Sequence, residues 1–356
     1  MSVRNLDKIL RPRSVAIVGA SNRPDHVSFT VLKNLLEAGY EGEVFPVHPD
    51  FEHVHGLKAY PTISALPRLT DLAVVCSPAK TVPSIVRQAG EFGLKGMVII
   101  SAGFREIGGA GQKLEQRIGR QAAQFPGLRI LGPNCMGIVV PHLKLNASLA
   151  SATPKPGRVA FVSQSGTLCS SALDWALQED IGFSHIVSIG NMLGVSVADL
   201  IDYFAADSST DSIILYVESI TQARHFMSAA RAVTKEKPIV VYKAGRFTQS
   251  ADAVVSHTGA MSGIDAVYEA AFERAGVVRV FEIDDMFDCA QLLARVKPPT
   301  GPRLAIVTNA GGPGVVATDS LLDRKGELAK LSPQTIEQLH EFLPRHWSRS
   351  NPCLLY

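Results

Sequence analysis

The sequence has no segment of the kind that crosses or enters a membrane. No apolar run approaches the roughly 20 residues that a transmembrane helix needs, and the first residues, Met1–Lys8, lack the apolar core of a signal peptide. The 5 cysteines are far apart and form no CxxC pair, which argues against a structural zinc site and favours free thiols. We therefore expect a cytoplasmic protein with no metal site of its own and no membrane partner.

The sequence also has no marked excess of charge of either sign. Its 35 Lys and Arg residues and 33 Asp and Glu residues are interspersed and give a formal net charge of +2. No basic stripe with interleaved aromatic residues is present, so the pattern argues against a nucleic-acid partner. Apolar residues are plentiful, at 46% of 356 residues, which suffices for the buried sheets of two or three domains.

A short pattern recurs three times: an apolar β-run, a turn of small residues and a helical pattern. Its alanines, Ala16, Ala160 and Ala305, are 144 and 145 residues apart, which is a normal domain length. The pattern is typical of the opening of a nucleotide-binding α/β domain. Proline-rich stretches before each copy indicate linkers. We therefore predict a first domain at 1–150, a second at 151–298 and a partial third at 299–356.

β-runs and helical patterns alternate throughout these domains. The first continues with strands at 43–47, 71–76, 96–101 and 128–132 and helices at 28–38, 81–92 and 111–124. The second has strands at 158–163, 184–189, 212–218, 238–243 and 277–280 and helices at 167–178, 195–206, 222–234, 264–275 and 283–295. The third begins with a strand at 303–308 and a helix from about 314. This alternation predicts the α/β class, with two Rossmann-like or flavodoxin-like parallel-sheet domains plus the start of a third, truncated α/β domain.

The first turn of small residues, Gly19-Ala20-Ser21, is not the GxGxxG fingerprint of a dinucleotide site. The acid that would hold the ribose of NAD is also misplaced, because Asp50 follows the strand-breaking Pro49. Both departures disfavour NAD. Small residues at a helix N-terminus still suit a diphosphate, which backbone N–H groups can bind. The alternative is a packing turn without a ligand.

The second turn, Ser163–Thr167, combines hydroxyl groups, a glycine that allows close approach, and the start of a helix. These features predict an anion site, although an ordinary helix cap by Ser163 or Ser165 would explain the same residues. The third turn, Asn309–Gly314, has similar chemistry in an incomplete domain.

His257 lies among small residues and glycines between an apolar strand and a helix. A neutral imidazole with room around it can attack phosphorus and carry a phosphoryl group; the alternative is a glycine-rich turn with an incidental histidine. Glu218 ends an apolar strand, where ligands collect in parallel sheets. It could fix the imidazole tautomer, or it could be a solvated strand end. Four other histidines have no comparable setting and are interpreted as surface or loop residues: His48, His53, His55 and His185.

Six motifs in one order resemble the NDP-forming acyl-CoA synthetases, a family that includes the succinyl-CoA synthetase α subunit and the α part of acetate–CoA ligase (ADP-forming). The motifs span nearly the whole chain. They lie at 16–21, 100–104, 131–137, 163–167, 256–259 and 309–314.

The resemblance implies a role for each motif. It implies that the first domain binds coenzyme A, through Gly19, Ala20, Ser21, Pro78, Asn134, Cys135 and Gly137. It implies that His257 is phosphorylated, that Glu218 supports it, and that the phosphate is held by Ser163, Gln164, Ser165, Gly166, Thr258 and Gly259. Such enzymes interconvert acyl-CoA, phosphate and ADP with a carboxylic acid, coenzyme A and ATP, through an acyl phosphate and then a phosphohistidine.

Two departures from the family qualify this expectation. The family uses an ATP-grasp domain to exchange phosphate with ADP or ATP and Mg²⁺, and residues 1–356 do not supply one. We therefore expect an ATP-grasp β subunit or domain as partner, an oligomeric assembly, and no turnover by the chain alone. The usual Asn-Pro-Val-Asp motif appears as Asn351-Pro352-Cys353-Leu354 near the chain end, which indicates a natural truncation or a fragment.

Three alternatives stay open at this point. One is a non-catalytic coenzyme A-sensing module, as found beside protein acetyltransferase domains; the presence of His257 argues against it. Another is an NAD-binding oxidoreductase, which the Gly19 turn disfavours. The third is a truncated, inactive product.

Overall fold

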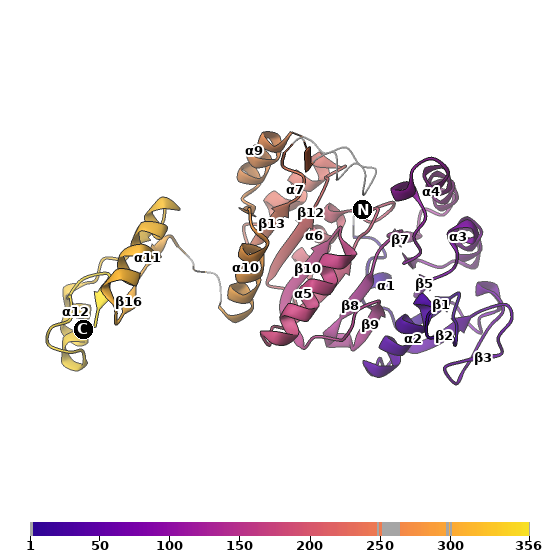
Figure 1. The fold of residues 1–356 in the computed structure, drawn as a ribbon, viewed down its shortest axis with the longest axis horizontal. Helices are drawn as coiled ribbons and strands as arrows, with labels where there is room; N and C mark the ends of the chain where they lie inside the picture. The colour runs from indigo at the N-terminus through magenta and orange to yellow at the C-terminus, as the bar shows by residue number, and fades with distance from the viewer. Residues whose placement is uncertain (1–2, 248, 251–263, 297–298, 300, 356) are drawn as a thin grey trace. The chain divides into compact units, whose positions relative to one another are not determined.

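The computed structural model describes residues 3–247, 249–250, 264–296, 299 and 301–355. The chain forms two compact units, Met1–Val296 and Lys297–Tyr356, and each is described on its own (Figure 1). Among the described residues, none of the helices combines the length and the apolar character that crossing a bilayer requires.

The first unit begins with a parallel sheet of five strands in the order β2-β1-β5-β6-β7. Side chains of β1 alternate between two cores: Val15 and Ile17 face α1 and α2, whereas Ala16 and Val18 face α3 and α4. The sheet is therefore covered on both faces. The strands are β1 (Ser14–Val18), β2 (Glu43–Val47), β5 (Leu72–Val75), β6 (Gly96–Ile99) and β7 (Arg129–Leu131), and the helices are α1 (Asp7–Leu10), α2 (Val27–Glu37), α3 (Val82–Phe92) and α4 (Gly109–Ala122).

The second sheet has seven strands in the order β14-β13-β12-β10-β11-β8-β9. Its central strand alternates in the same way, since Val159 and Phe161 pack toward α5 and α10 and Ala160 and Val162 toward α6, α7 and α9. The parallel strands are β10 (Pro156–Ser163), β11 (Phe183–Ser188), β12 (Ser212–Val217), β13 (Ile239–Lys243) and β14 (Val278–Val280). The helices are α5 (Gly166–Gln178), α6 (Val197–Ala206), α7 (Ala223–Val233), α9 (Asp265–Ala275) and α10 (Ile283–Arg295).

An antiparallel hairpin, β8 (Gly137–Val140) and β9 (Leu145–Ser148), forms one edge of this second sheet. The sequence predicted that the first domain ends at residue 150. In the structure the chain passes from the first sheet to the second sheet earlier, between β7 and β8. The hairpin also contacts the first domain, because the Asn34 side chain in α2 donates hydrogen bonds to the carbonyl oxygens of Ser148 (2.9 Å) and Ala150 (2.8 Å). One apolar core runs from α1 and α2 to α6 and α7, so the two sheets pack as one unit.

The second unit contains two small parallel sheets rather than the single strand expected at 303–308. β15 (Arg303–Leu304) pairs with β17 (Glu327–Leu328), and β16 (Val307–Thr308) pairs with β18 (Cys353–Leu354). The expected strand is split in two because β15 and β16 pair with different strands, and the change occurs at Ile306. The Ile306 N–H donates to Asn351 Oδ1 (2.9 Å), and the Ile306 carbonyl oxygen accepts from the Cys353 N–H (2.7 Å). The helices are α11 (Gly311–Asp323), which starts before the expected 314, and α12 (Pro333–Phe342).

The predicted fold class is confirmed, and the long strands and helices lie within a few residues of their expected ranges. Short elements were not predicted. These are α1, β8, β9, β17 and β18, together with β3 (His53–Val54), β4 (Leu57–Lys58), η1 (Ile63–Ala65), η2 (Ala79–Thr81), η3 (Arg105–Ile107) and η4 (Pro141–Leu143). The longer helix α12 was not predicted either.

The interpretation of His185 as a surface or loop residue was wrong. Its side chain lies in β11 and is 1% exposed, because this sheet is covered on both faces. Burial lowers the pKa of His185 to about 4, although Asp207, 3.6 Å away, opposes the shift. Burial would disfavour the Asp207 carboxylate as well, but hydrogen bonds from Thr210 and Ser209 lower the pKa of Asp207 to about 2.

This buried histidine predicts acid sensitivity. Between pH 6.5 and about 4 the unfolded chain protonates His185 and the folded chain does not, so the free energy of unfolding falls as pH is lowered through this window. The slope from one proton is at most about 1.4 kcal/mol per pH unit. His185→Leu should flatten the dependence of Tm on pH in this window, whereas exposed His53→Leu should not. Equal slopes in both variants would contradict the assignment.

Candidate functional site

The site lies at the carboxyl edge of the second sheet, where β10, β12 and β13 end side by side. Ser163 is the register partner of Tyr216, and Val217 is the partner of Lys243. The turn into α5 and the residue Glu218 therefore leave the sheet next to each other, as the sequence predicted for parallel strands.

The turn between β10 and α5 is shaped by its own hydroxyl groups. Ser163 Oγ accepts a hydrogen bond from Ser165 N–H (3.0 Å) and donates to Ser165 O (2.8 Å). Ser165 caps α5, since its Oγ accepts from Leu168 N–H at 3.2 Å. The cap and the anion site are compatible, because a helix leaves its first N–H groups without intrahelical acceptors. The N–H groups of Gly166 and Thr167 remain for an anion, with the helix dipole behind them.

Gln164 connects this turn to the end of β12. Its Oε1 accepts hydrogen bonds from the N–H groups of Glu218 and Ser219, the latter at 3.0 Å. Its Nε2 donates to the Ser219 carbonyl oxygen (2.9 Å) and lies 3.2 Å from the Met192 sulfur. With a side chain 8% exposed, Gln164 satisfies buried backbone groups that have no strand partner.

Glu218 is 4% exposed and is not the solvated strand end of the alternative interpretation. Lys243, the last residue of β13, is 1% exposed. Burial lowers the pKa of Lys243, whereas the negative charges of Asp265 and Glu218 raise it. The carboxyl edge thus holds two buried ionisable side chains, one directly after β12 and one at the end of β13.

A cavity of about 640 Å³ brings residues of both sheets together. Pro78, Asn134 and Cys135 line it from loops after strands of the first sheet, and residues 164–167 line it from the second. The N-terminus of α5 therefore opens into a space walled by the predicted coenzyme A loops. The backbone of Asn134 adopts φ +55° and its N–H donates to the Ser101 carbonyl oxygen at 3.0 Å.

A second cavity, of about 420 Å³, lies beside the Gly19 turn. It shares His26, Ser77 and Pro78 with the first cavity, so the two adjoin. Gly19 has φ +83°, and a Cβ there would lie 2.5 Å from Ser77 Oγ. Only glycine fits at this position, since both the backbone conformation and the space exclude a side chain.

The other predicted residues that the structure describes do not line these two cavities. Ala20 and Ser21 are buried in the turn behind Gly19. Gly137 starts β8, where a Cβ would lie 2.2 Å from the Ala147 carbonyl oxygen, so the hairpin requires a glycine there. His257, Thr258 and Gly259 lie outside the described residues.

The thiols near the cavity are not poised as nucleophiles. Burial raises the pKa of Cys135 and of Cys169 to about 12 and raises the pKa of Cys76 as well. Cys135 Sγ lies 3.3 Å from the Ile99 carbonyl oxygen and can donate to it. These cysteines therefore act as small buried side chains at neutral pH. No group of three or more His, Cys, Asp or Glu side chains that could hold a metal occurs in the part of the chain that the structure describes.

Sequence reasoning missed His26, Ser77 and Lys243. His26 caps α2, its Nδ1 accepting from Ser28 N–H at 3.3 Å, and it lines both cavities. The sequence did contain a signal for His26, since it directly precedes the first helix of a nucleotide-binding pattern, where ligands bind. For Lys243, the signal was a charged residue directly after the buried run Ile239–Tyr242.

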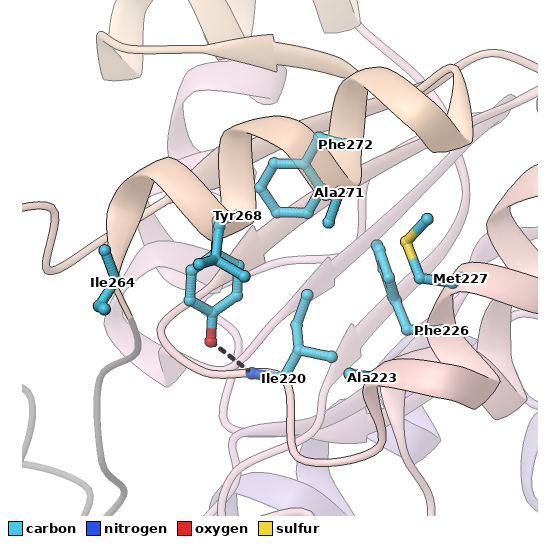
Figure 2. Close-up of a pocket in the computed structure, with 9 residues that line it drawn as sticks. Ile220, Ala223, Phe226, Met227, Ile264, Tyr268, Ala271 and Phe272 are labelled. Atoms are coloured by element: carbon cyan, nitrogen blue, oxygen red, sulfur yellow. Dashed lines mark hydrogen bonds between the residues drawn. The ribbon is translucent and has the colours of Figure 1, made fainter.

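An apolar pocket of about 280 Å³ lies between α7 and α9, near the carboxyl edge (Figure 2). Phe226 and Met227 from α7 face Tyr268 and Phe272 from α9. The Tyr268 hydroxyl accepts a hydrogen bond from Ile220 N–H (3.3 Å), two residues after Glu218. Tyr268 thus connects α9 to the loop that follows β12.

Two family patterns match consecutive parts of the chain. The pattern described as a CoA binding domain matches residues 13–141, and the pattern described as a succinyl-CoA ligase like flavodoxin domain matches residues 156–293. Between them they cover every strand of the two large sheets except β9.

Relatives and a solved structure agree with these patterns. The chain is 42% identical over 348 residues to the acetate–CoA ligase [ADP-forming] II subunit alpha of Pyrococcus furiosus, covering 98% of this chain and 75% of that protein. It is 41% identical over 320 residues to the I subunit alpha of the same organism, covering 89% and 69%. The dinucleotide forming acetyl-coenzyme A synthetase 1 of Ca. Korarchaeum cryptofilum, solved with phosphate and ADP, superimposes with a TM-score of 0.92 at 37% identity, covering 98% and 75%.

The hydrogen bonds of Gln164 predict its contribution to stability. Gln164→Met keeps the length of the side chain but leaves the buried N–H groups of Glu218 and Ser219 without their acceptor, which should cost about 1–3 kcal/mol. We expect a lower midpoint of urea unfolding than in the parent. The exposed Gln178→Met is the matched control and should unfold as the parent does. Identical midpoints for all three proteins would show that Gln164 does not hold the edge together.

Proposed function

The chain belongs to the family of the ADP-forming acetate–CoA ligase α subunits, and from that membership we propose that it converts acyl-CoA and phosphate to a carboxylic acid and coenzyme A through a phosphohistidine. A partner subunit then passes the phosphoryl group to ADP. The observation that carries this proposal is the 640 Å³ cavity, in which the loops of the CoA-binding domain face the N-terminus of α5.

We propose that coenzyme A binds along the two adjoining cavities. Its diphosphate would approach the Gly19 turn, where backbone N–H groups at the start of α2 favour an anion. Its thiol end would reach the cavity lined by Pro78, Asn134 and Cys135, next to the turn at Ser165. The required glycine at 19 supports this arrangement, because a side chain would fill the approach to the backbone.

Phosphate chemistry would take place at the N-terminus of α5. Phosphate attacks the thioester carbonyl of acyl-CoA, the C–S bond breaks, and coenzyme A leaves as its thiol, which gives an acyl phosphate. An imidazole nitrogen of His257 then attacks phosphorus, a P–N bond forms, the P–O bond to the acyl group breaks, and the carboxylate leaves. The N–H groups of Gly166 and Thr167 and the α5 dipole stabilise the phosphoryl charge in both steps.

We propose that Glu218 orients His257. Its carboxylate would accept the N–H of one imidazole nitrogen and leave the other unprotonated for attack. Two observations support this role: Glu218 is buried at the sheet edge, and Gln164 fixes its backbone beside the α5 turn. Thr258 and Gly259 are proposed as further phosphate ligands on the histidine segment.

The nucleotide step is assigned to a partner. The relatives are named as alpha subunits, which supports a second subunit, and we propose that it is an ATP-grasp subunit that binds ADP or ATP with Mg²⁺. We also propose a cytoplasmic location, where acyl-CoA and ADP are available.

Ligand choice tests the first half of the proposal. Calorimetry should detect binding of coenzyme A but not of NAD. Gly19→Val should weaken coenzyme A binding by roughly tenfold or more, since 1.4 kcal/mol of lost contact corresponds to a factor of ten. Gly56→Val is the matched control, because Gly56 also has a positive φ (+77°) but a Cβ there meets nothing within 4 Å. Tight NAD binding without coenzyme A binding would overturn the assignment.

Phosphoryl labelling tests the second half. Given radiolabelled acetyl phosphate, the protein should acquire an acid-labile, base-stable phosphoryl group on His257. His257→Asn should abolish labelling, and Glu218→Gln should lower its rate by ~10²-fold if Glu218 orients the imidazole. Both variants should bind coenzyme A as the parent does. Unchanged labelling of His257→Asn, or a phosphate mapped to a serine, would refute the mechanism.

A further inference from the structure

The two adjoining cavities beside the Gly19 turn and the α5 turn have an unusual lining for a site that would hold an anion. None of the described residues that line them is an Asp, Glu, Lys or Arg. An anionic ligand there must therefore be bound by backbone N–H groups, hydroxyl groups and imidazole rings. Three residues line both cavities and so mark the passage between them: His26, Ser77 and Pro78.

The hydrogen bonds of His26 determine which of its ring nitrogens carries the proton. His26 precedes α2 in an extended conformation, and its Nδ1 accepts a hydrogen bond from the Ser28 N–H at 3.3 Å. Because a backbone N–H can only donate, Nδ1 is unprotonated, and the Ser28 hydroxyl, whose oxygen lies 2.7 Å from Nδ1, donates to it as well. In the neutral imidazole the proton is therefore on Nε2.

The Nε2–H donor of His26 is not used within the protein. Over the ranges that the structure describes, Nε2 has no hydrogen-bond or ion-pair partner, since the contacts of the ring are made by Nδ1. The charged residues just before it, Arg23 and Asp25, pair with each other at 2.7 Å, are 71% and 68% exposed, and line neither cavity. His26 itself is only partly buried. A donor on a residue that lines both cavities is thus available to a ligand.

Ser77 supplies a second donor at the same passage. It lies two residues after β5, and its carbonyl oxygen accepts a hydrogen bond from Ser101 Oγ at 2.6 Å, which fixes the backbone there. A Cβ at Gly19 would lie 2.5 Å from Ser77 Oγ, so this hydroxyl borders the turn that the diphosphate of coenzyme A is proposed to approach. The passage therefore adjoins the proposed diphosphate position.

We propose that His26 is a coenzyme A-binding residue, whose Nε2–H donates to the diphosphate where the ligand passes from one cavity to the other, together with the Ser77 hydroxyl. The inference rests on the proposed function, because it takes the diphosphate to lie at the Gly19 turn. Phosphate oxygens accept short, strong hydrogen bonds from such donors. The two ring nitrogens of His26 then have separate tasks: Nδ1 caps α2, and Nε2 binds the ligand.

Two substitutions separate these tasks. His26→Asn keeps a preferred N-cap residue, whose side-chain oxygen takes the place of Nδ1, but no atom reaches as far as Nε2. His26→Gln places an amide N–H near the position of Nε2 but carries its oxygen beyond the start of the helix. We expect His26→Asn to weaken coenzyme A binding in calorimetry by about tenfold or more at an unchanged midpoint of urea unfolding. His26→Gln should lower that midpoint and bind coenzyme A nearly as the parent does.

Three ligands identify the group that His26 contacts. Coenzyme A carries a diphosphate and a 3′-phosphate, dephospho-coenzyme A carries only the diphosphate, and pantetheine carries neither. His26→Asn should weaken the binding of the first two by the same factor and leave the binding of pantetheine, followed by NMR titration, unchanged. His53→Asn is the matched control, because His53 is exposed and lines neither cavity. It should bind all three ligands as the parent does.

The results that would overturn the inference are distinct. If His26→Asn binds coenzyme A as tightly as the parent, Nε2 makes no contact with the ligand. A loss that extends to pantetheine, or that disappears with dephospho-coenzyme A, would exclude the diphosphate as the group contacted. Equal losses in His26→Gln and His26→Asn would show that the cap and not the donor matters. His26→Ser, which also caps a helix, serves if His26→Asn fails to fold. If the parent itself binds no coenzyme A, the proposed function fails and not merely this inference.

Discussion

The carboxamide of Gln164 is the constraint on which the geometry of the site depends. One oxygen accepts two backbone N–H groups beyond the end of β12, and the nitrogen returns a hydrogen bond to the same loop. Parallel strands bring their ends to one edge, but the loops that follow are free to diverge. Gln164 removes that freedom, so Glu218 and the N-terminus of α5 keep one spacing.

The cavity in front of this edge depends on how the two sheets pack. Asn191 lies at the centre of the contact: its side chain donates to Glu106 (2.8 Å) and Glu115 (2.7 Å), and its carbonyl oxygen accepts from Arg105 (2.6 Å). Glu106 also accepts from the N–H groups of Gly103 and Phe104. Because these bonds join the loop after β6 to the loop after β11, the coenzyme A loops and the α5 turn are held as facing walls of one cavity.

The sequence was sufficient for the features that local patterns determine. Each long strand is an apolar run bounded by glycine, proline or polar residues, so its position and its parallel pairing could be predicted. The β8–β9 hairpin could not, because its membership in the second sheet depends on antiparallel pairing with β11, which no local pattern indicates. The burial of His185 and Lys243 likewise depends on helices that cover the sheet from elsewhere in the chain. The position of His257 relative to Glu218 stays a prediction.

The two lysines near the ends of β13 show two ways in which the fold accommodates a cation that is shielded from solvent. Lys237, before the strand, donates to carbonyl oxygens at the C-terminal end of α6, where the helix dipole favours a cation. Lys237 therefore caps the C-terminal end of α6, and this interaction needs no carboxylate partner. Lys243, the last residue of the strand, is almost fully buried and donates to the Ala244 carbonyl oxygen at the edge where ligands collect in parallel sheets. The second lysine brings a desolvation cost, which nearby negative charge opposes.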